Sequence, residues 1–493
     1  RESRGLGDVY KRQHIRYPIE NSEEFITIAT TRPETMLGDT AIAVNPSDER
    51  YKKVVGKFVI IPLVGRKIKI IEDEYADPEQ GTGAVKITPA HDFNDYEVGE
   101  RNNLEIINVF TEDGKINENA PKEFIGLDRF EARKQLLKKL KENNFFVEEE
   151  NIKNKVPYGD RSNSIIEPYL TEQWFADAKK LSIKAKEIVN NKSTNFFPEN
   201  WSKTYFQWMD NIEPWCVSRQ LWWGHQIPAW YGPDGKVFVE YTEEEAIKEA
   251  KNYYKKDVEL KRDEDVLDTW FSSGLWPFAT LGWPNQTDYL KKFYPTTVLV
   301  TGFDIIFFWV ARMMMMGMAF LEKEPFKDIY VHALVRDEKG QKMSKSKGNV
   351  IDPLDLIEKY SADALRFTLL SMASPGRDVK LSEDRVKGYR NFLNKIWNAN
   401  NLLKQNDCNF DEIEKPKELK VNINKWIISE YYSINNQIKQ NIKDYRFDEA
   451  ARNAYQFVWH SFCDWYLELS KTILYSDDKS SIEEVKKVSA YIF

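Results

Sequence analysis

The sequence predicts an α/β protein in three parts: a β-rich domain, a core with a parallel sheet, and a helical bundle. Short β-type runs separated by Gly, Pro and Asp fill residues 14–157. Strand-like runs alternate with helical ones over residues 158–381, which is the pattern of a parallel sheet. From residue 382 to 493 apolar residues recur at helical spacing. A chain of 493 residues is long enough for several domains.

The β-rich part contains one helical pattern, over Asp128–Asn143, and five strand-like runs. We expect these elements to form a compact mixed or barrel-like β domain. The five runs are Phe25–Ala29, Ala41–Val44, Phe58–Ile61, Lys67–Ile71 and Ala84–Ile87.

The central part has strand-like runs at Thr297–Val300 and Asp328–Leu334, with helical segments between them. Residues Tyr241–Lys261 are dense in Glu and Lys, which indicates an exposed helix and loop. The last part shows one-sided apolar stripes and predicts a helical bundle. Its three helical segments are Glu383–Lys404, Asn424–Tyr445 and Asp448–Ser476.

The composition describes a globular protein rather than a uniformly basic nucleic-acid binder, since the formal net charge is −7. The three cysteines are far apart, so we expect neither disulfides nor a zinc site, and a reducing cytoplasmic compartment fits. The apolar stretch Val298–Phe320 is interrupted by Asp304 and Arg312, so we expect no membrane partner. We further expect a monomer without a bound structural metal.

The strongest local motif is Lys342-Met343-Ser344-Lys345-Ser346, which lies between Gly340 and Gly348 and follows a predicted strand. Ammonium groups and hydroxyls on such a loop can close over a polyphosphate and neutralise the charge that develops on a leaving pyrophosphate. The flanking glycines give the loop freedom to close and reopen.

This loop resembles the signature loop of class I aminoacyl-tRNA synthetases, and the resemblance extends over nearly the whole chain from about residue 15. It implies a Rossmann-like core, here its C-terminal half, with an inserted editing domain and a following anticodon-binding bundle. It also implies that Lys342 and Lys345 stabilise the transition state of amino-acid adenylation. Lys345 would then be an ATP ligand, and Mg²⁺ would accompany the nucleotide.

A second element of the synthetic site is Thr301-Gly302-Phe303-Asp304, directly after the apolar run Val298–Val300. A glycine and a carboxylate at a strand end are suited to binding a nucleotide ribose. In class I synthetases the corresponding corner binds adenosine, which implies that Gly302 and Asp304 contact ATP.

The amino-acid pocket is predicted from Trp270, Ile305 and Trp309. Ile305 and Trp309 are four residues apart and share one face of a helix. Without their sequence context, these residues would be interpreted as ordinary core residues. The segments Trp215–His225 and Gly302–Met316 resemble the valine-specific members of the family, in which the counterparts of the three residues contact the valine side chain. Isoleucine specificity is the nearest alternative, and the bulk of Trp309 opposes it.

Two further segments, Thr30–Thr35 and Gly81–Asp95, offer cations, hydroxyls, carboxylates and flexible glycines. Such groups can hold a tRNA 3′ end and orient a water molecule for ester hydrolysis. An apolar pocket sized for valine cannot strongly reject threonine, so a second, polar site is needed. Both segments resemble the editing domain of the valine, isoleucine and leucine synthetases. The resemblance places six residues in that pocket: Arg32, Thr35, Lys86, Thr88, Asp92 and Asp95.

The expected reaction is ATP-dependent ligation of valine to tRNA(Val) through valyl-adenylate, with hydrolytic editing of Thr-tRNA(Val). A fragment that only binds or edits tRNA is the alternative, and ATP–pyrophosphate exchange separates the two. The family's His-Ile-Gly-His-like element does not occur in the sequence. We therefore expect that the chain begins inside the inserted domain and does not itself activate valine. We also expect that residues 1–13 are a non-native leader, and that the end at Phe493 is a truncation.

Overall fold

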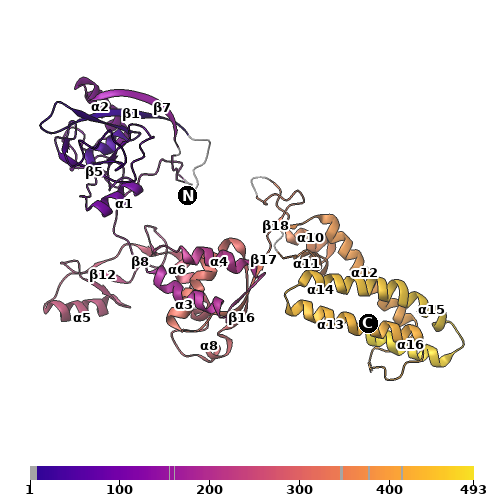
Figure 1. Cartoon of the computed structure of the whole chain (residues 1–493). Helices are drawn as coiled ribbons and strands as arrows, with labels where there is room; N and C mark the ends of the chain where they lie inside the picture. The colour runs from indigo at the N-terminus through magenta and orange to yellow at the C-terminus, as the bar shows by residue number, and fades with distance from the viewer. Residues whose placement is uncertain are drawn as a thin grey trace. The chain divides into compact units, whose positions relative to one another are not determined.

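The computed structural model describes residues 8–154, 156–159, 162–344, 348–375, 378–411, 413 and 415–493. The chain divides into two compact units, the first ending at Glu172 and the second beginning at Gln173 (Figure 1). We predicted the first boundary at residue 157. The segment that follows Pro157 therefore belongs to the first unit, and Glu167 within it pairs with Arg32 and Arg129.

Two sheets build the part of the first unit that the structure describes. One is antiparallel with strand order β2-β1-β7, and the other is mixed with order β4-β5-β3-β6. Each of the five predicted runs is a strand, and in β2 and β5 buried residues alternate with more exposed ones. The strands are β1 (Asp8–Pro18), β2 (Phe25–Thr30), β3 (Ala41–Val44), β4 (Phe58–Ile60), β5 (Lys67–Glu72), β6 (Ala84–Ile87) and β7 (Phe146–Asn154).

Strand β1 extends into the segment that we had set apart from the fold. Residues Asp8–Gln13 pair with β7 in antiparallel register, and Lys11 and Arg12 form ion pairs with Glu149 and Glu150 on that strand. The sequence pattern missed both strands because they are polar. Their pairing depends on backbone hydrogen bonds, which leave no apolar alternation to read.

Among its described residues the first unit also has three helical elements: the 3-10 helix η1 (Pro33–Gly38), α1 (Phe93–Asn102) and α2 (Arg129–Glu142). The predicted helix corresponds to α2, and its cap Asp128 accepts a hydrogen bond from the Phe130 amide. Arg133 on α2 donates two 2.7 Å hydrogen bonds to the carboxylate of Glu34 on η1, which is wholly buried. This bidentate pair joins the two elements.

The second unit contains the predicted parallel sheet, with strand order β16-β17-β9. Its strands are β16 (Thr296–Gly302), β17 (Phe326–His332) and β9 (Asn195–Phe197). A helical crossover joins β16 to β17, and its residues Met313–Met316 are buried, as expected for helix packing. The crossover consists of η2 (Phe303–Ile305), the π-helix η3 (Ile306–Ala311) and α9 (Arg312–Phe320).

The crossover corrects one expectation. By length and composition, Phe303–Phe320 is apolar enough to cross a membrane despite its two charged residues. Half of this span is buried inside the unit, where Ile306, Val310 and Ala311 lie in the main core. A buried core helix explains the same composition, so the segment gives no support for a membrane partner.

Further elements precede and follow this sheet in the chain. Helix α5 is the predicted charged helix, but Ala246 and Ala250 on it pack with Trp230 and Phe238 in a small separate core. The elements before the sheet's crossover are β8 (Phe175–Ala176), α3 (Ala178–Asn190), α4 (Asn200–Asp210), β10 (Trp215–Cys216), β11 (Ser218–Arg219), β12 (Ala229–Tyr231), β13 (Val237–Val239), α5 (Glu243–Tyr254), β14 (Lys261–Arg262), β15 (Val266–Leu267), α6 (Thr269–Ser273), α7 (Trp276–Ala279) and α8 (Asp288–Phe293). After it come β18 (Val335–Arg336), α10 (Pro353–Tyr360), α11 (Ala362–Ser371) and β19 (Val379–Lys380).

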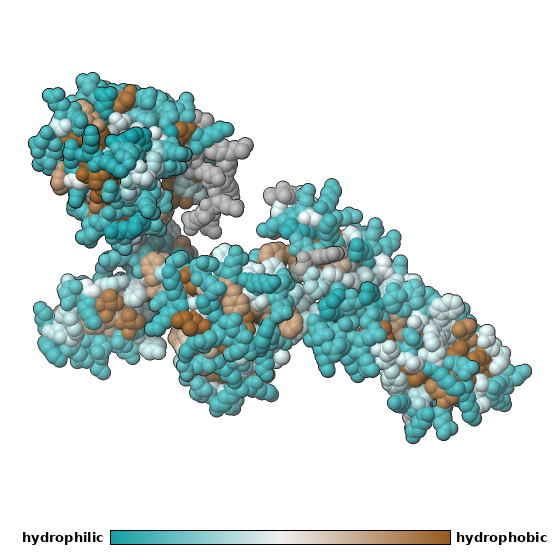
Figure 2. All heavy atoms as spheres, viewed as in Figure 1, coloured by the Kyte–Doolittle hydropathy of each residue, from teal (hydrophilic) through white to brown (hydrophobic). Residues whose placement is uncertain are grey.

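The predicted helical bundle forms the end of the second unit, and its apolar stripes meet in a core that includes Ile427, Phe462 and Tyr466. The third predicted segment is divided by a π-helix. Hydrophilic residues cover most of the visible surface (Figure 2). The elements are α12 (Glu383–Gln405), α13 (Asn422–Lys443), α14 (Phe447–Tyr455), the π-helix η5 (Gln456–Leu467), α15 (Glu468–Leu474) and α16 (Lys479–Ile492).

Arg133→Ala is expected to destabilise the first unit by about 3 kcal/mol, because it leaves the buried Glu34 carboxylate without its main partner. Every tryptophan lies beyond Glu172, so hydrogen exchange of the β2 and β6 amides is the suitable measurement. The control is Lys134→Ala, which removes an exposed pair with Glu131 and is expected to cost less than about 0.5 kcal/mol. Equal protection in both variants would contradict the prediction.

Candidate functional site

A cavity of about 480 Å³ in the first unit is lined by all six residues predicted for the editing pocket. Thr30, Thr31, Tyr75, Gly81 and His91 are among the other lining residues. Segments that are distant in the sequence therefore meet at one polar cavity. The six predicted residues are Arg32, Thr35, Lys86, Thr88, Asp92 and Asp95.

The secondary structure explains how these residues meet. Arg32 and Thr35 lie where β2 passes into η1, whereas Lys86 lies on β6, which pairs with β3. Asp92 and Asp95 lie at the start of α1. Asp92 is the extended N-cap, and its carboxylate accepts hydrogen bonds from the Asn94 and Asp95 amides.

Arg32 is held by acceptors within the unit. It donates a 2.5 Å hydrogen bond to the carbonyl of His91 and forms an ion pair with Glu167. Glu167 also accepts from Arg129, with 2.9 Å between the carboxylate oxygen and Nε. The hydroxyl of Thr35 donates to the Arg32 carbonyl. The cation that we predicted for an RNA phosphate thus already has a carboxylate partner.

Asp95 is the predicted carboxylate with the most perturbed environment. Burial raises its pKa to about 6, against lowering by the Lys86 charge and by the Thr88 amide, which donates to Oδ2 at 2.9 Å. A carboxylate with this pKa exchanges its proton near neutral pH, as groups in catalytic and binding sites often do.

Two residues at this cavity were missed by sequence reasoning. Asp39, directly after η1, is wholly buried and hydrogen-bonds to Lys86 and Thr88. His91 is also buried, and its Nε2 accepts from the Val109 amide at 2.9 Å. Burial, with Arg32 and Lys86 nearby, lowers the His91 pKa to about 3, so the ring is neutral. The available signal differed between them: His91 lies inside the segment Gly81–Asp95, whereas Asp39 lies four residues after Thr35 and outside both segments.

In the second unit Gly302 ends strand β16 and pairs with His332 on β17. A Cβ atom at Gly302 would lie 2.6 Å from Oδ1 of Asp304, so a side chain at this position would displace the carboxylate from the strand end. Asp304 itself is exposed. A glycine and an accessible carboxylate therefore meet at the carboxyl end of a parallel strand, where nucleotides bind in such sheets.

The three residues predicted for the amino-acid pocket are half-buried. Trp309 Nε1 donates to the carbonyl of Ser273 at 3.1 Å, which ties η3 to α6, the helix that carries Trp270. We expected Ile305 and Trp309 on one α-helix. Ile305 instead ends a 3-10 helix and Trp309 lies in a π-helix, so the α-helical spacing that we used does not describe this segment.

The lysine–serine loop is only partly described. Lys342 is exposed, whereas Lys345 lies outside the described residues. Asn349 accepts from the Ser344 amide at 2.9 Å and donates to Asp337 at 2.9 Å. It also donates to the Lys342 carbonyl at 3.3 Å, so Asn349 fastens both sides of the loop base.

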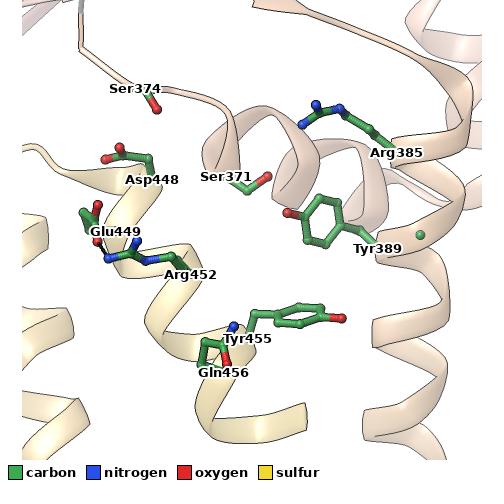
Figure 3. Close-up of a pocket in the computed structure, with 10 residues that line it drawn as sticks. Ser371, Ser374, Arg385, Tyr389, Asp448, Glu449, Arg452, Tyr455 and Gln456 are labelled. Atoms are coloured by element: carbon green, nitrogen blue, oxygen red, sulfur yellow. Dashed lines mark hydrogen bonds and ion pairs between the residues drawn. The ribbon is translucent and has the colours of Figure 1, made fainter. Parts of the chain in front are cut away.

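A second cavity, of about 490 Å³, lies among α11, α12 and α14 and contains none of the predicted residues (Figure 3). Tyr389 and Tyr455 line it together with Arg385. Arg452 also lines it and pairs with Glu449, so this guanidinium is already neutralised by a neighbour.

The chain belongs to the class I tRNA synthetases. The family model "tRNA synthetases class I (I, L, M and V)" matches residues 33–382, and the model "Anticodon-binding domain of tRNA ligase" matches residues 424–493. In fold, the chain is similar to a methionyl-tRNA synthetase of Mycobacterium tuberculosis in complex with methionyl-adenylate. That match has a TM-score of 0.52 and 15% identity, and covers 69% of this chain and 61% of that one.

Within this class the chain is similar to valine–tRNA ligases. It is 78% identical to the enzyme of Pelagibacter ubique (strain HTCC1062) over 480 residues, which cover 97% of this chain and 55% of the relative. It is 56% identical to the valine–tRNA ligase of Caulobacter vibrioides, covering 95% of this chain and 52% of the relative. The chain therefore spans about half the length of the relatives it matches.

Asp95 is expected to make stability depend on pH. Burial raises its folded pKa to about 6 from an ordinary value of 3.8, so its stabilising contribution is complete below 3.8 and lost as pH rises through 6. The free energy of unfolding of Asp95→Asn, relative to that of the wild type, should therefore rise by about 2 kcal/mol between pH 4 and pH 7. Hydrogen exchange of the β6 amides measures it, and ¹³C NMR of the carboxyl groups gives the pKa. A titration midpoint near 3.8 would contradict the prediction.

Proposed function

We propose that this chain is the editing and synthetic part of an enzyme that ligates valine to tRNA(Val). Valine would react with ATP to give valyl-adenylate and pyrophosphate, and the terminal ribose of tRNA(Val) would then accept the valyl group and release AMP. The similarity to valine–tRNA ligases over 97% of the chain supports this assignment. We further propose that the enzyme is a cytoplasmic monomer that does not act at membranes.

For the synthetic site we propose that Gly302 and Asp304 contact the adenosine of ATP. Lys342 and Lys345 would neutralise the charge that develops on pyrophosphate. Mg²⁺ would enter with the nucleotide and share this charge. Trp270, Ile305 and Trp309 would surround the valine side chain. The hydrogen bond between Trp309 and Ser273 supports this assignment, because it joins η3 to α6.

For the cavity of the first unit we propose hydrolysis of Thr-tRNA(Val). Water would attack the ester carbonyl carbon, and the bond to the ribose oxygen would break to release threonine and free tRNA. The observation that carries this proposal is that all six predicted residues line one cavity. Arg32 and Lys86 have the charge needed to approach an RNA end. Asp92 and Asp95 can pair with the ammonium group and the hydroxyl of threonine.

The chain is therefore expected to deacylate Thr-tRNA(Val) faster than Val-tRNA(Val). Asp95→Ala should lower the ratio of the two rate constants about tenfold, because the substrate hydroxyl loses a buried partner. Arg32→Ala should instead lower both rate constants by similar factors, because it weakens contact with the RNA end that both substrates share. Single-turnover deacylation of the two charged tRNAs measures both effects.

Glu131→Gln, on the exposed face of α2, is the matched control and should leave both rate constants unchanged. Equal rate constants for the threonyl and valyl esters in the wild-type chain would refute editing. In a full-length synthetase with this chain's residues, ATP–pyrophosphate exchange tests the synthetic function separately, since its readout does not involve the cavity.

In a full-length synthetase with this chain's residues, Trp309→Ala is expected to raise activation of isoleucine relative to valine about tenfold. Removing the ring makes room for one more methylene group. The measurement is pyrophosphate exchange with each amino acid. Trp309→Phe is the control, since it also loses the hydrogen bond to Ser273 but keeps an aromatic ring at the side of the pocket. If both variants discriminate like wild type, Trp309 belongs to the core and not to the pocket.

A further inference from the structure

Asp39 is a wholly buried carboxylate immediately behind the cavity of the first unit. Its Oδ2 accepts from the hydroxyl of Tyr17 at 2.7 Å. Its Oδ1 accepts from the hydroxyl of Thr88 at 2.6 Å and from Nζ of Lys86 at 3.3 Å. Arg66 donates to the backbone carbonyl of Asp39 at 3.0 Å. The whole residue is therefore held in one position.

Two of the three side-chain donors to Asp39, Lys86 and Thr88, line the cavity. A hydroxyl has a single proton, and Thr88 directs its proton to Asp39. Toward the cavity Thr88 can then only accept a hydrogen bond. Without the carboxylate the Thr88 hydroxyl would be free to rotate and donate, so Asp39 determines which role Thr88 plays.

The ammonium group of Lys86 has three protons. One points to Asp39 and one to the Thr88 oxygen, which leaves the third for the cavity. Lys86 is also buried, and a buried cation needs a nearby anion. Burial raises the pKa of Asp39, while Lys86, Thr88 and Tyr17 lower it. The three donors that converge on its two oxygens match the ionised carboxylate.

We propose that Asp39 is a positioning residue for substrate selection: it orients Lys86 and Thr88 so that the cavity offers one N–H donor beside one oxygen acceptor. The hydroxyl of a threonyl ester can accept from Lys86, and its single proton can go to the Thr88 oxygen or to the neighbouring Asp95. The methyl group of a valyl ester satisfies neither and leaves them unpaired. This inference rests on the proposed editing function and adds the residue that sets its specificity from behind the pocket wall.

Asp39→Asn is the principal test. The amide keeps the shape of the side chain but loses the negative charge that compensates the buried Lys86 ammonium, and only one of its two polar atoms can accept a hydrogen bond. The ratio of threonyl to valyl deacylation rate constants is expected to fall roughly tenfold, while valyl hydrolysis changes less than about twofold. Tyr17→Phe is the matched control. It removes a donor to the opposite oxygen of the same carboxylate, and it should keep the ratio within about twofold of wild type.

The wild-type chain allows a second test that does not depend on how the variant folds. tRNA(Val) charged with 2-amino-3-fluorobutyrate presents a fluorine that cannot donate to Thr88. Its deacylation is expected to be roughly tenfold slower than that of the threonyl ester. Equal rates for these two esters, or an unchanged ratio in a folded Asp39→Asn chain, would overturn the role of Asp39 while editing itself stands. No preference for threonine in the wild-type chain would overturn the editing proposal, and this inference with it.

Discussion

The buried ammonium group of Lys86 is the constraint around which the first unit is arranged. Strand β6 carries it into the interior, opposite Ile42 of β3, and a cation there must be compensated. Asp39 comes just before β3, and the Thr40 amide donates to the Ile87 carbonyl at 2.9 Å, so the strand register itself brings the carboxylate to Lys86. The same register sets Thr88 against Asp39 and Asp95. The polar site thus forms where the sheet must compensate the charge of Lys86.

Beside the cavity, too, a carboxylate compensates cations. Arg32 and Arg129 share Glu167, which belongs to the segment after the last strand of the unit. This shared carboxylate fastens that segment to the β-rich domain. It also means that a phosphate approaching Arg32 must replace a carboxylate already in place. Binding of an RNA end would therefore exchange one anion for another, which costs less than bringing a lone charge out of water.

The second unit depends on backbone geometry more than on buried charge. Gly302 gives the Asp304 carboxylate space at the end of β16, and a tight 3-10 turn and a π-helix follow it. The π-helix sets the direction of Trp309, whose indole bonds to Ser273. Departures from α-helical geometry of this kind are frequent at functional sites, because they re-aim single side chains without disturbing the core.

Much of this architecture was predictable from the sequence. Short β-type runs separated by Gly, Pro and Asp located five strands of the first unit, and apolar residues at helical spacing over Asp128–Asn143 located α2, because these patterns record burial and chain turns locally. The motifs also named the six residues that meet at the cavity. The polar strands β1 and β7, the helix types around Trp309, and the partners Asp39, His91 and Glu167 came only from the tertiary structure. Backbone pairing and charge compensation join residues far apart in the chain, and no local pattern records which of many carboxylates will reach a given buried cation.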